Sequence, residues 1–340
     1  MKAAVYYNNN DVRIEEVEKP KLRDGEILVR IEASGICGSD VMEWYRIKKA
    51  PLVLGHEIAG VVVEVGKGVE KFKEGDRVTA AHHVPCNTCR YCLRGDHSVC
   101  DTLRATNFYP GGFCEYVRVP AINVDRGVFK LPDTVSFEDG SFSEPLGCVL
   151  RGQRACKMEA GKNVLVIGSG LSGLLHIKLA KALGAGKITA TDISDFRLSA
   201  AKKCGADYIF KADVDVPSMM REATGRLADI VIICASADSA FKQGLESVDR
   251  AGAVMFFAPK EPGKTYPMPV FDMWRDNITV INSYASPPFD TLASIDLIES
   301  ARVTVADIIT HRLPLRETAH GFKLVAEARQ SLKVIIEPQK

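Results

Sequence analysis

Four cysteines at short intervals form the densest group of potential metal ligands in the sequence. They follow the pattern Cys-x2-Cys-x2-Cys-x7-Cys at Cys86, Cys89, Cys92 and Cys100. Four thiolates at this spacing can surround one zinc ion tetrahedrally within a single loop and leave no ligand position open. Such a site is structural, because the binding energy of the metal becomes folding energy of a loop without a core of its own. Free thiols and disulfides are the alternative interpretations.

A second set of potential zinc ligands is dispersed along the chain. Cys37 lies in Gly-Ile-Cys-Gly-Ser-Asp, His56 and Glu57 lie in Gly-His-Glu, and Glu144 lies in Ser-Glu-Pro-Leu-Gly-Cys. One thiolate, one imidazole and one or two carboxylates can hold a zinc ion that keeps a position for water or substrate. Spacing alone does not join these segments, and a lone cysteine or histidine is more often a packed side chain.

A glycine-rich segment indicates a dinucleotide site. Residues 168–173 read Gly-x-Gly-x-x-Gly between an apolar run and a helical pattern, which is the context that this motif requires. The glycines allow a tight turn, close approach of the backbone to a pyrophosphate, and close packing of helix on strand, while the helix N-terminus favours the phosphates.

An acidic residue ends the next strand pattern, about 20 residues further on. The carboxylate of Asp192 can bind the adenosine ribose hydroxyls and repel a 2′-phosphate, which favours NAD over NADP. Arg197 could weaken this preference, although a solvated helix charge is its simpler interpretation. The predicted cofactor-binding residues are Gly168, Gly170, Leu171, Ser172, Gly173, Asp192 and Arg197.

The elements that must position these residues change character after residue 145. Short Val- and Ile-rich runs at 26–34, 58–66, 76–82 and 112–120 predict a β-rich, barrel-like domain over residues 1–145. Residues 146–287 predict an α/β domain, because apolar strand patterns alternate with helical patterns and favour a parallel sheet covered on both faces. The expected strands are 163–168, 187–192, 208–210, 229–235, 253–259 and 277–284, with helices at 171–184 and 196–204. The tail, 288–340, is expected to return to the first domain with one helix and a strand at 334–338.

Composition excludes several classes of partner. Lys and Arg together number 44 against 43 Asp and Glu, for a net charge of +1, so we expect no nucleic-acid or membrane partner. We see no secretory signal and no apolar run long enough to span a bilayer. Because four of the ten cysteines crowd into residues 86–100, the pattern favours metal thiolates in a reducing compartment, and we expect a cytoplasmic protein.

Residues 55–69, Gly-His-Glu-Ile-Ala-Gly-Val-Val-Val-Glu-Val-Gly-Lys-Gly-Val, resemble the signature of the zinc-containing alcohol dehydrogenases of the medium-chain dehydrogenase/reductase superfamily. The resemblance covers nearly the whole chain and implies a GroES-like barrel catalytic domain with a Rossmann nucleotide domain. The chain is most similar to the polyol (sorbitol-type) and threonine dehydrogenase branches. The reason is Glu144, since liver-type alcohol dehydrogenases place a cysteine ligand there.

The resemblance also implies roles for individual residues. Glu57 becomes a zinc ligand in some states, and Glu144 becomes a ligand either directly or through water. Ser39 becomes the hydroxyl that passes the proton of the alcohol onward. The remaining implied roles are those of Cys37 and His56 as ligands of a catalytic zinc, Asp40 as the partner that orients His56, and Lys333 as the partner of Glu57.

One position departs from the family pattern. Relatives commonly read Cys-Gly-Ser/Thr-Asp-x-His, whose histidine ends a proton relay, but this chain has Met42 in that place. Because methionine cannot transfer a proton, either the cofactor ribose passes it to water or another group substitutes. Glu43 and His82 are the candidates. Trp44, Tyr45 and Phe108 either line the substrate site or pack between barrel and cysteine lobe.

Together these observations predict an enzyme with two zinc ions per chain, one catalytic and one structural, that transfers hydride between a secondary alcohol and NAD. A small, polyol-like alcohol is the expected substrate. A threonine-like amino alcohol is the nearest alternative, and it would need counter-charges that the sequence does not identify. A non-catalytic NAD-binding protein on the same scaffold would be expected to have lost a zinc ligand. By analogy with relatives, we expect a homodimer or homotetramer paired through edge strands at 277–284.

Overall fold

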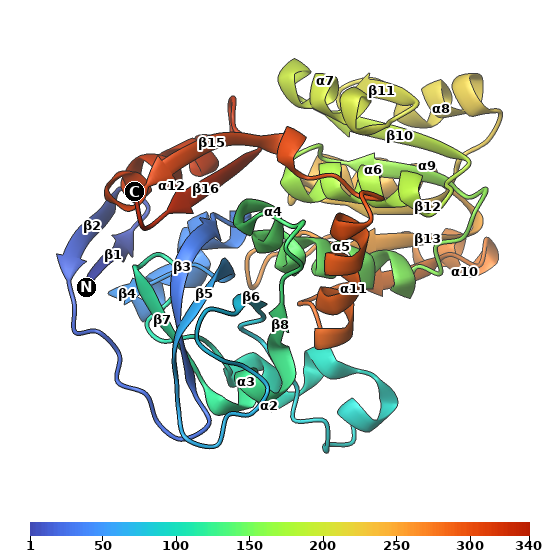
Figure 1. Ribbon diagram of the computed structural model, residues 1–340. Helices are drawn as coiled ribbons and strands as arrows, with labels where there is room; N and C mark the ends of the chain where they lie inside the picture. The colour runs from blue at the N-terminus through green and yellow to red at the C-terminus, as the bar shows by residue number, and fades with distance from the viewer. The chain divides into compact units, whose positions relative to one another are not determined.

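The computed structural model describes all residues, 1–340, and its contacts divide the chain into two compact units (Figure 1). The first unit contains Met1–Gly147 and Ala285–Lys340, and the second contains Cys148–Tyr284. The unit boundaries therefore lie after Gly147 and after Tyr284, whereas the sequence analysis predicted them after Pro145 and after Pro287. Both chain termini belong to the first unit. None of the helices combines the length and the apolar character needed to span a membrane.

The second unit is built on one sheet of six parallel strands, in the order β11-β10-β9-β12-β13-β14. This confirms the predicted α/β architecture. The strands are β9 (Asn163–Ile167), β10 (Lys187–Asp192), β11 (Tyr208–Lys211), β12 (Ala228–Ile233), β13 (Val248–Phe256) and β14 (Thr279–Asn282). The helices are α5 (Ser143–Ala155), whose first residues belong to the first unit, α6 (Leu171–Ala182), α7 (Asp195–Cys204), α8 (Val216–Thr224), α9 (Asp238–Ser247) and α10 (Val270–Arg275).

Helices cover both faces of this sheet, which explains why its central strands β9 and β12 contain continuous apolar runs. Every residue of β9 is buried, and Leu165 and Ile167 join a core cluster with Val216 of α8 and Phe241 of α9. The chain runs in one direction across the sheet from β9 to β11 and then returns to β12. Since parallel crossovers are right-handed, α6 and α7 lie on one face and α8 and α9 on the other.

The first unit contains a seven-stranded sheet and a three-stranded sheet. The larger sheet has the order β15-β16-β3-β5-β6-β8, with β7 also paired to β3, and the smaller has the order β2-β1-β4. The strands are β1 (Lys2–Asn8), β2 (Asp11–Glu16), β3 (Ile27–Gly35), β4 (Leu52–Val53), β5 (Glu57–Val65), β6 (Arg77–Ala80), β7 (Tyr116–Val119), β8 (Val128–Lys130), β15 (Ile309–Pro314) and β16 (Lys333–Glu337). The helices are α1 (Glu43–Arg46), α2 (Asp101–Ala105), α3 (Ala121–Gly127), α4 (Phe137–Ser141), α11 (Pro288–Glu299) and α12 (Thr318–Glu327).

The core of the barrel comes from alternating residues of its long strands. Ile27, Val29 and Ile31 of β3 are buried against Ile58 and Val62 of β5. Because successive side chains of a strand point to opposite faces, this alternation sets the register of β3 on β5. That register positions the residues just beyond Gly35 and just before Glu57.

The tail contains more helices and strands than the sequence analysis predicted, so that prediction was wrong. Residues 288–340 contain two helices and two strands, where one of each was expected. The missed strand, β15, has three consecutive polar residues, Thr310 to Arg312, and lies at the edge of its sheet, so its apolar pattern is weak. The final strand, β16, lies between β15 and β3, and Val334, Ile335 and Ile336 are fully buried there.

Candidate active site

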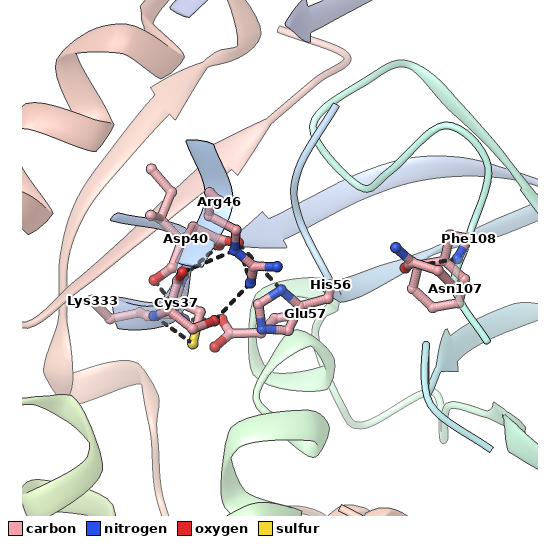
Figure 2. Close-up of polar contacts among 10 residues, drawn as sticks. Cys37, Asp40, Arg46, His56, Glu57, Asn107, Phe108 and Lys333 are labelled. Carbon is pink, nitrogen blue, oxygen red and sulfur yellow. Dashed lines mark hydrogen bonds and ion pairs between the residues drawn. The ribbon is translucent and has the colours of Figure 1, made fainter. Parts of the chain in front are cut away.

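Strand pairing brings together ligands that are distant in sequence. Gly35 at the end of β3 lies opposite Glu57 at the start of β5. Cys37 is two residues beyond the first position and His56 is one residue before the second, so the register alone places them side by side. One ligand atom from each of Cys37, His56 and Glu57 lies within 4.8 Å of the other two. Figure 2 shows the three side chains converging.

Asp40 orients the imidazole of His56. Its carboxylate is fully buried, and Oδ1 lies 3.4 Å from His56 Nδ1. The backbone N–H of Cys37 donates to the other oxygen of Asp40 at 3.0 Å. Burial by itself would lower the pKa of His56, but Asp40 and Cys37 outweigh it and hold that pKa well above its ordinary value. The surroundings of His56 therefore favour positive charge, which a zinc ion bound to Cys37 and His56 would supply.

A buried ion pair holds Glu57. Lys333 Nζ contacts Glu57 Oε2 and donates to the carbonyl of Ile36 at 3.2 Å, and both charged side chains are fully buried. A side chain at Gly35 would collide with both partners and would have to displace the ion pair. The second oxygen of Glu57, Oε1, is buried and has no hydrogen-bond partner. An unpartnered buried carboxylate oxygen beside a thiol and an imidazole fits a metal-binding position.

Ser39 lies in the short 3₁₀ turn Gly38–Val41, directly after Cys37. Its backbone N–H donates to Cys37 Sγ at 3.4 Å. Arg46, on α1, donates through Nη2 to Ser39 Oγ and through Nε to the Ser39 carbonyl, each at 3.0 Å. The sequence analysis missed Arg46. Nothing in the sequence separates this single arginine on a short helix from an ordinary solvated charge.

Two histidines lie beside the three ligands. The ring centroids of His56 and His82 are 4.7 Å apart, and those of His82 and His83 are 3.8 Å apart. Burial lowers the pKa of His82 well below its ordinary value, with further lowering by His83, His56 and Arg46, and burial lowers the pKa of His83 to about 4. Both imidazoles are therefore neutral near pH 7. His82 Nδ1 is buried without a hydrogen-bond partner.

The remaining predicted residues of this region are more scattered. Phe108 is only 4% exposed and packs in the barrel core, apart from the ligands in Figure 2, so it has a packing role. Trp44 is half-buried, whereas Tyr45 and Glu43 are exposed. Glu144 is buried at the start of α5 but is not among the three residues whose ligand atoms converge.

The four cysteines of the loop 86–100 also converge. Their sulfur atoms all lie within 4.8 Å of one another, with 3.9 Å between Cys86 and Cys92 and 3.5 Å between Cys89 and Cys92. Tetrahedral Zn–S bonds of about 2.3 Å require sulfur–sulfur distances of about 3.8 Å, so the arrangement fits a zinc ion. All ten cysteines of the chain are free thiols. Hydrogen bonds from Thr88 and from the Cys89 backbone lower the pKa of Cys86 to about 5, which favours the thiolate.

The glycine motif forms the turn between β9 and α6. Gly168 has φ of +90°, which glycine adopts readily, and a side chain at Gly173 would collide with the Gly168 carbonyl. A Cβ atom at Gly170, by contrast, would meet nothing within 4 Å. The protein itself therefore does not require glycine at 170. Open space in front of the first N–H groups of a helix fits a bound pyrophosphate.

Asp192 is hydrogen-bonded to the glycine turn that joins β9 to α6. Its Oδ2 accepts a hydrogen bond from the backbone N–H of Ser169 at 2.8 Å, and its Oδ1 accepts one from Ser194 at 2.9 Å. Arg197 Nη1 lies 3.9 Å from Asp192 Oδ2, and Arg197 Nε is buried without a partner. The carboxylate is thus fixed next to the glycine turn, at the position where a ribose would be bound.

Comparison with known proteins places these features in a family. Residues 23–133 match the family "Alcohol dehydrogenase GroES-like domain", and residues 173–300 match "Zinc-binding dehydrogenase". The chain is 34% identical to L-threonine 3-dehydrogenase of Bacillus velezensis over 99% of both proteins. It is 32% identical to sorbitol dehydrogenase of Bombyx mori over 99% of this chain and 98% of that one. The solved structure of alcohol dehydrogenase TADH from Thermus sp. ATN1 matches with a TM-score of 0.89 and 30% identity over 99% of both chains. The chain therefore belongs to the zinc-containing alcohol dehydrogenases of the medium-chain dehydrogenase/reductase superfamily, and it is an oxidoreductase.

Proposed function

We propose that the protein oxidises a small secondary alcohol of the polyol type with NAD, using one catalytic and one structural zinc ion. The convergence of Cys37, His56 and Glu57 within 4.8 Å is the observation that supports this most strongly. A structural zinc at the four-cysteine loop is supported by the sulfur–sulfur distances. Since these ligands must stay thiolates, we infer a reducing compartment and hence the cytoplasm.

Each residue of the site has a distinct task in this proposal. When bound by Cys37 and His56, zinc supplies a Lewis acid that favours loss of the proton of the alcohol, and NAD supplies the hydride acceptor. Asp40 fixes the orientation of His56. Lys333 holds one oxygen of Glu57 and leaves the other free to face the metal position. Ser39 accepts the proton of the alcohol at Oγ.

The character of the site favours a hydroxylated, uncharged substrate. His82 and His83 are neutral imidazoles, which can exchange hydrogen bonds with hydroxyl groups without introducing charge. A relative from Bombyx mori is named sorbitol dehydrogenase, in agreement with a polyol. A β-hydroxy amino acid is the second candidate, because the relative from Bacillus velezensis is named L-threonine 3-dehydrogenase.

A substrate panel tests the proposed function. Sorbitol, xylitol, butane-2,3-diol, threonine and propan-2-ol are offered with NAD, and NADH formation is followed by absorbance together with the zinc content of the protein. We expect a polyol or diol to give the highest kcat/KM, with two zinc ions per chain. Preference for threonine would select the second candidate. Failure of the zinc-loaded protein to oxidise any of these alcohols would overturn the proposed substrate class.

The choice of cofactor can be tested at Asp192. Changing Asp192 to Asn or Ala should lower the ratio of kcat/KM with NAD to kcat/KM with NADP by about 100-fold, because repulsion between like charges costs several kcal/mol. Asp195→Asn is the matched control, since the side chain of Asp195 is exposed and pairs only with Lys211. A native enzyme that prefers NADP, or a ratio that the Asp192 variants leave unchanged, would contradict the assignment of NAD.

We further propose that the protein is at least a homodimer joined through β14. This strand is the edge of the parallel sheet, and Val280 and Ile281 are only partly covered. Phe271 and Trp274 on the preceding helix α10 are 66% and 77% exposed. Exposed edge strands and contiguous aromatic residues are otherwise a liability for a monomer.

A charged residue at this edge should disrupt the assembly. Trp274→Glu is expected to shift the mass measured by size-exclusion chromatography with light scattering toward the monomer. Leu93→Glu is the control, because Leu93 is equally exposed, at 74%, but lies in the four-cysteine loop. A native protein that elutes as a monomer would disprove the proposed interface.

A further inference from the structure

In this chain Ser39 is bound by Arg46, and the histidine that the family pattern places three residues after the serine is absent. Met42 occupies the position of the usual relay histidine, and its thioether cannot accept and release protons. Four residues later, Arg46 reaches back along the short helix to Ser39. Its Nη2 donates to the hydroxyl oxygen and its Nε donates to the carbonyl of the same residue, each at 3.0 Å. Figure 2 shows the guanidinium between Asp40 and His56.

We propose that Arg46 is a positioning residue that fixes the Ser39 hydroxyl for proton transfer and thereby compensates for the missing relay histidine. This inference rests on the role of Ser39 in the proposed function. It assigns no proton transfer to Arg46 itself, because a guanidinium has only hydrogen-bond donors and no acceptor.

The contacts of Arg46 restrict the conformation of Ser39. A guanidinium has five N–H donors in a rigid plane, so its bonds to the carbonyl and to Oγ together restrain the side-chain torsion of the serine. The arginine is restrained in turn. Its Nη2 lies 3.5 Å from the buried Asp40 Oδ1, its Cζ lies 4.6 Å from the ring centroid of Tyr45, and its side chain is only 15% exposed.

The bond from Arg46 also determines how the hydroxyl can react. A serine hydroxyl has one hydrogen and two lone pairs. Arg46 occupies one lone pair, so the second lone pair remains to accept a proton and the hydrogen points away from Arg46. The fixed positive charge makes the O–H a better proton donor, since charged hydrogen-bond partners strengthen and polarise the bond.

The proton and electron balance of the reaction shows why the orientation of the Ser39 hydroxyl matters. Oxidation of the alcohol breaks its C–H bond, and the hydride, with both electrons, reduces NAD to NADH. The O–H bond of the alcohol breaks as well, and its proton passes to Ser39 Oγ while Ser39 releases its own proton to water. Without Arg46, the hydroxyl can rotate among its rotamers and spends less time aligned for this double transfer.

A double-mutant cycle tests the inference in the zinc-loaded enzyme. Arg46→Gln removes the positive charge and the paired hydrogen bonds to Ser39, whereas Arg46→Lys keeps the charge on a single nitrogen. Ser39→Ala removes the hydroxyl on which Arg46 is proposed to act. Lys48→Gln is the matched control, because Lys48 is an exposed neighbouring cation in the turn after α1. For each protein, kcat, KM, the solvent deuterium isotope effect on kcat and the zinc content are measured.

We expect Arg46→Gln to lower kcat by about 10- to 100-fold, the range associated with a charged hydrogen bond, while KM changes by less than about threefold. Arg46→Lys should recover part of the loss, and the solvent isotope effect should rise as proton transfer becomes slower. In the Ser39→Ala background, Arg46→Gln should lower kcat by less than about threefold, because the two residues act through one hydroxyl. Lys48→Gln should match the native enzyme.

The outcomes separate failure of this inference from failure of the proposed function. Full activity of Ser39→Ala would overturn the proposed role of Ser39 and this inference with it. If Ser39→Ala is impaired but Arg46→Gln lowers kcat by equal factors in both backgrounds, Arg46 acts independently of Ser39 and only the inference fails. A rise in KM at unchanged kcat would also overturn it, because Arg46 would then bind substrate. If the Arg46→Gln protein loses zinc, the cycle is repeated with Arg46→Lys. Equal factors of loss of kcat in the two Ser39 backgrounds would then overturn the inference.

Discussion

Cys37→Ser and His56→Ala are expected to lower kcat for alcohol oxidation by about 1,000-fold or more, because a Lewis acid contributes several kcal/mol to this chemistry. The two side chains come from different strands, Cys37 just after β3 and His56 just before β5, and they meet where Gly35 pairs with Glu57. Loss of either one leaves a single strong ligand beside Glu57. The glycine turn and Asp192 belong to the second unit, so neither substitution touches the residues proposed to bind NAD.

The measurement combines steady-state kinetics, zinc analysis and titration with NADH followed by fluorescence. We expect each variant to hold one zinc ion per chain instead of two and to bind NADH within about twofold of the native affinity. Cys114→Ser is the matched control, because Cys114 is a buried thiol of the same unit that belongs to neither cluster. Its sulfur donates to the Gly111 carbonyl, a bond that a serine hydroxyl can keep. Full turnover in a metal-free preparation would show that the proposed chemistry is wrong.

The second large effect concerns stability. Cys100→Ser should lower the melting temperature by on the order of 10 °C, because a structural zinc contributes several kcal/mol to folding. Residues 86–100 contain only short 3₁₀ turns, and their buried cluster consists of little more than Cys92, Cys100 and Leu103. Without the metal, this loop has too few apolar contacts to stay folded.

Thermal unfolding followed by circular dichroism, with zinc analysis of the same samples, measures this effect. The zinc content should again fall from two to one, but here the ion that remains is the catalytic one. Cys114→Ser serves as control once more and should melt close to the native temperature. A Cys100→Ser protein that keeps two zinc ions and the native melting temperature would show that the loop does not depend on a metal.

The local motifs could be predicted from the sequence because their parts lie within one loop or one turn. Cys86 and Cys100 are separated by 14 residues, so their approach requires only that the loop fold back on itself. The turn from Gly168 to Gly173 joins a strand directly to a helix, and both elements have clear apolar patterns. The parallel sheet was predicted for a similar reason, since its central strands contain continuous buried apolar runs at 164–167 and 230–233.

The dispersed site could be proposed only through the family resemblance. No local pattern joins His56 to the segment that contains Cys37 and Ser39, and the register of β3 on β5 brings Cys37 and His56 together. Arg46 escaped prediction altogether, because its contact with Ser39 depends on the path of a four-residue helix. The number of strands in the tail was underestimated, because only half of the residues of the edge strand β15 are apolar.

The sequence by itself determined the chemistry that the chain can perform: thiolates, imidazole and carboxylates for zinc, a glycine turn for a dinucleotide, and a parallel sheet to present it. Only the tertiary structure decided which of these groups meet. Insertion of β16 beside β3 buries Lys333 against Glu57, 276 residues away in sequence. Contacts at such separations follow from burying the apolar faces of paired strands in one register, and no local pattern records that register.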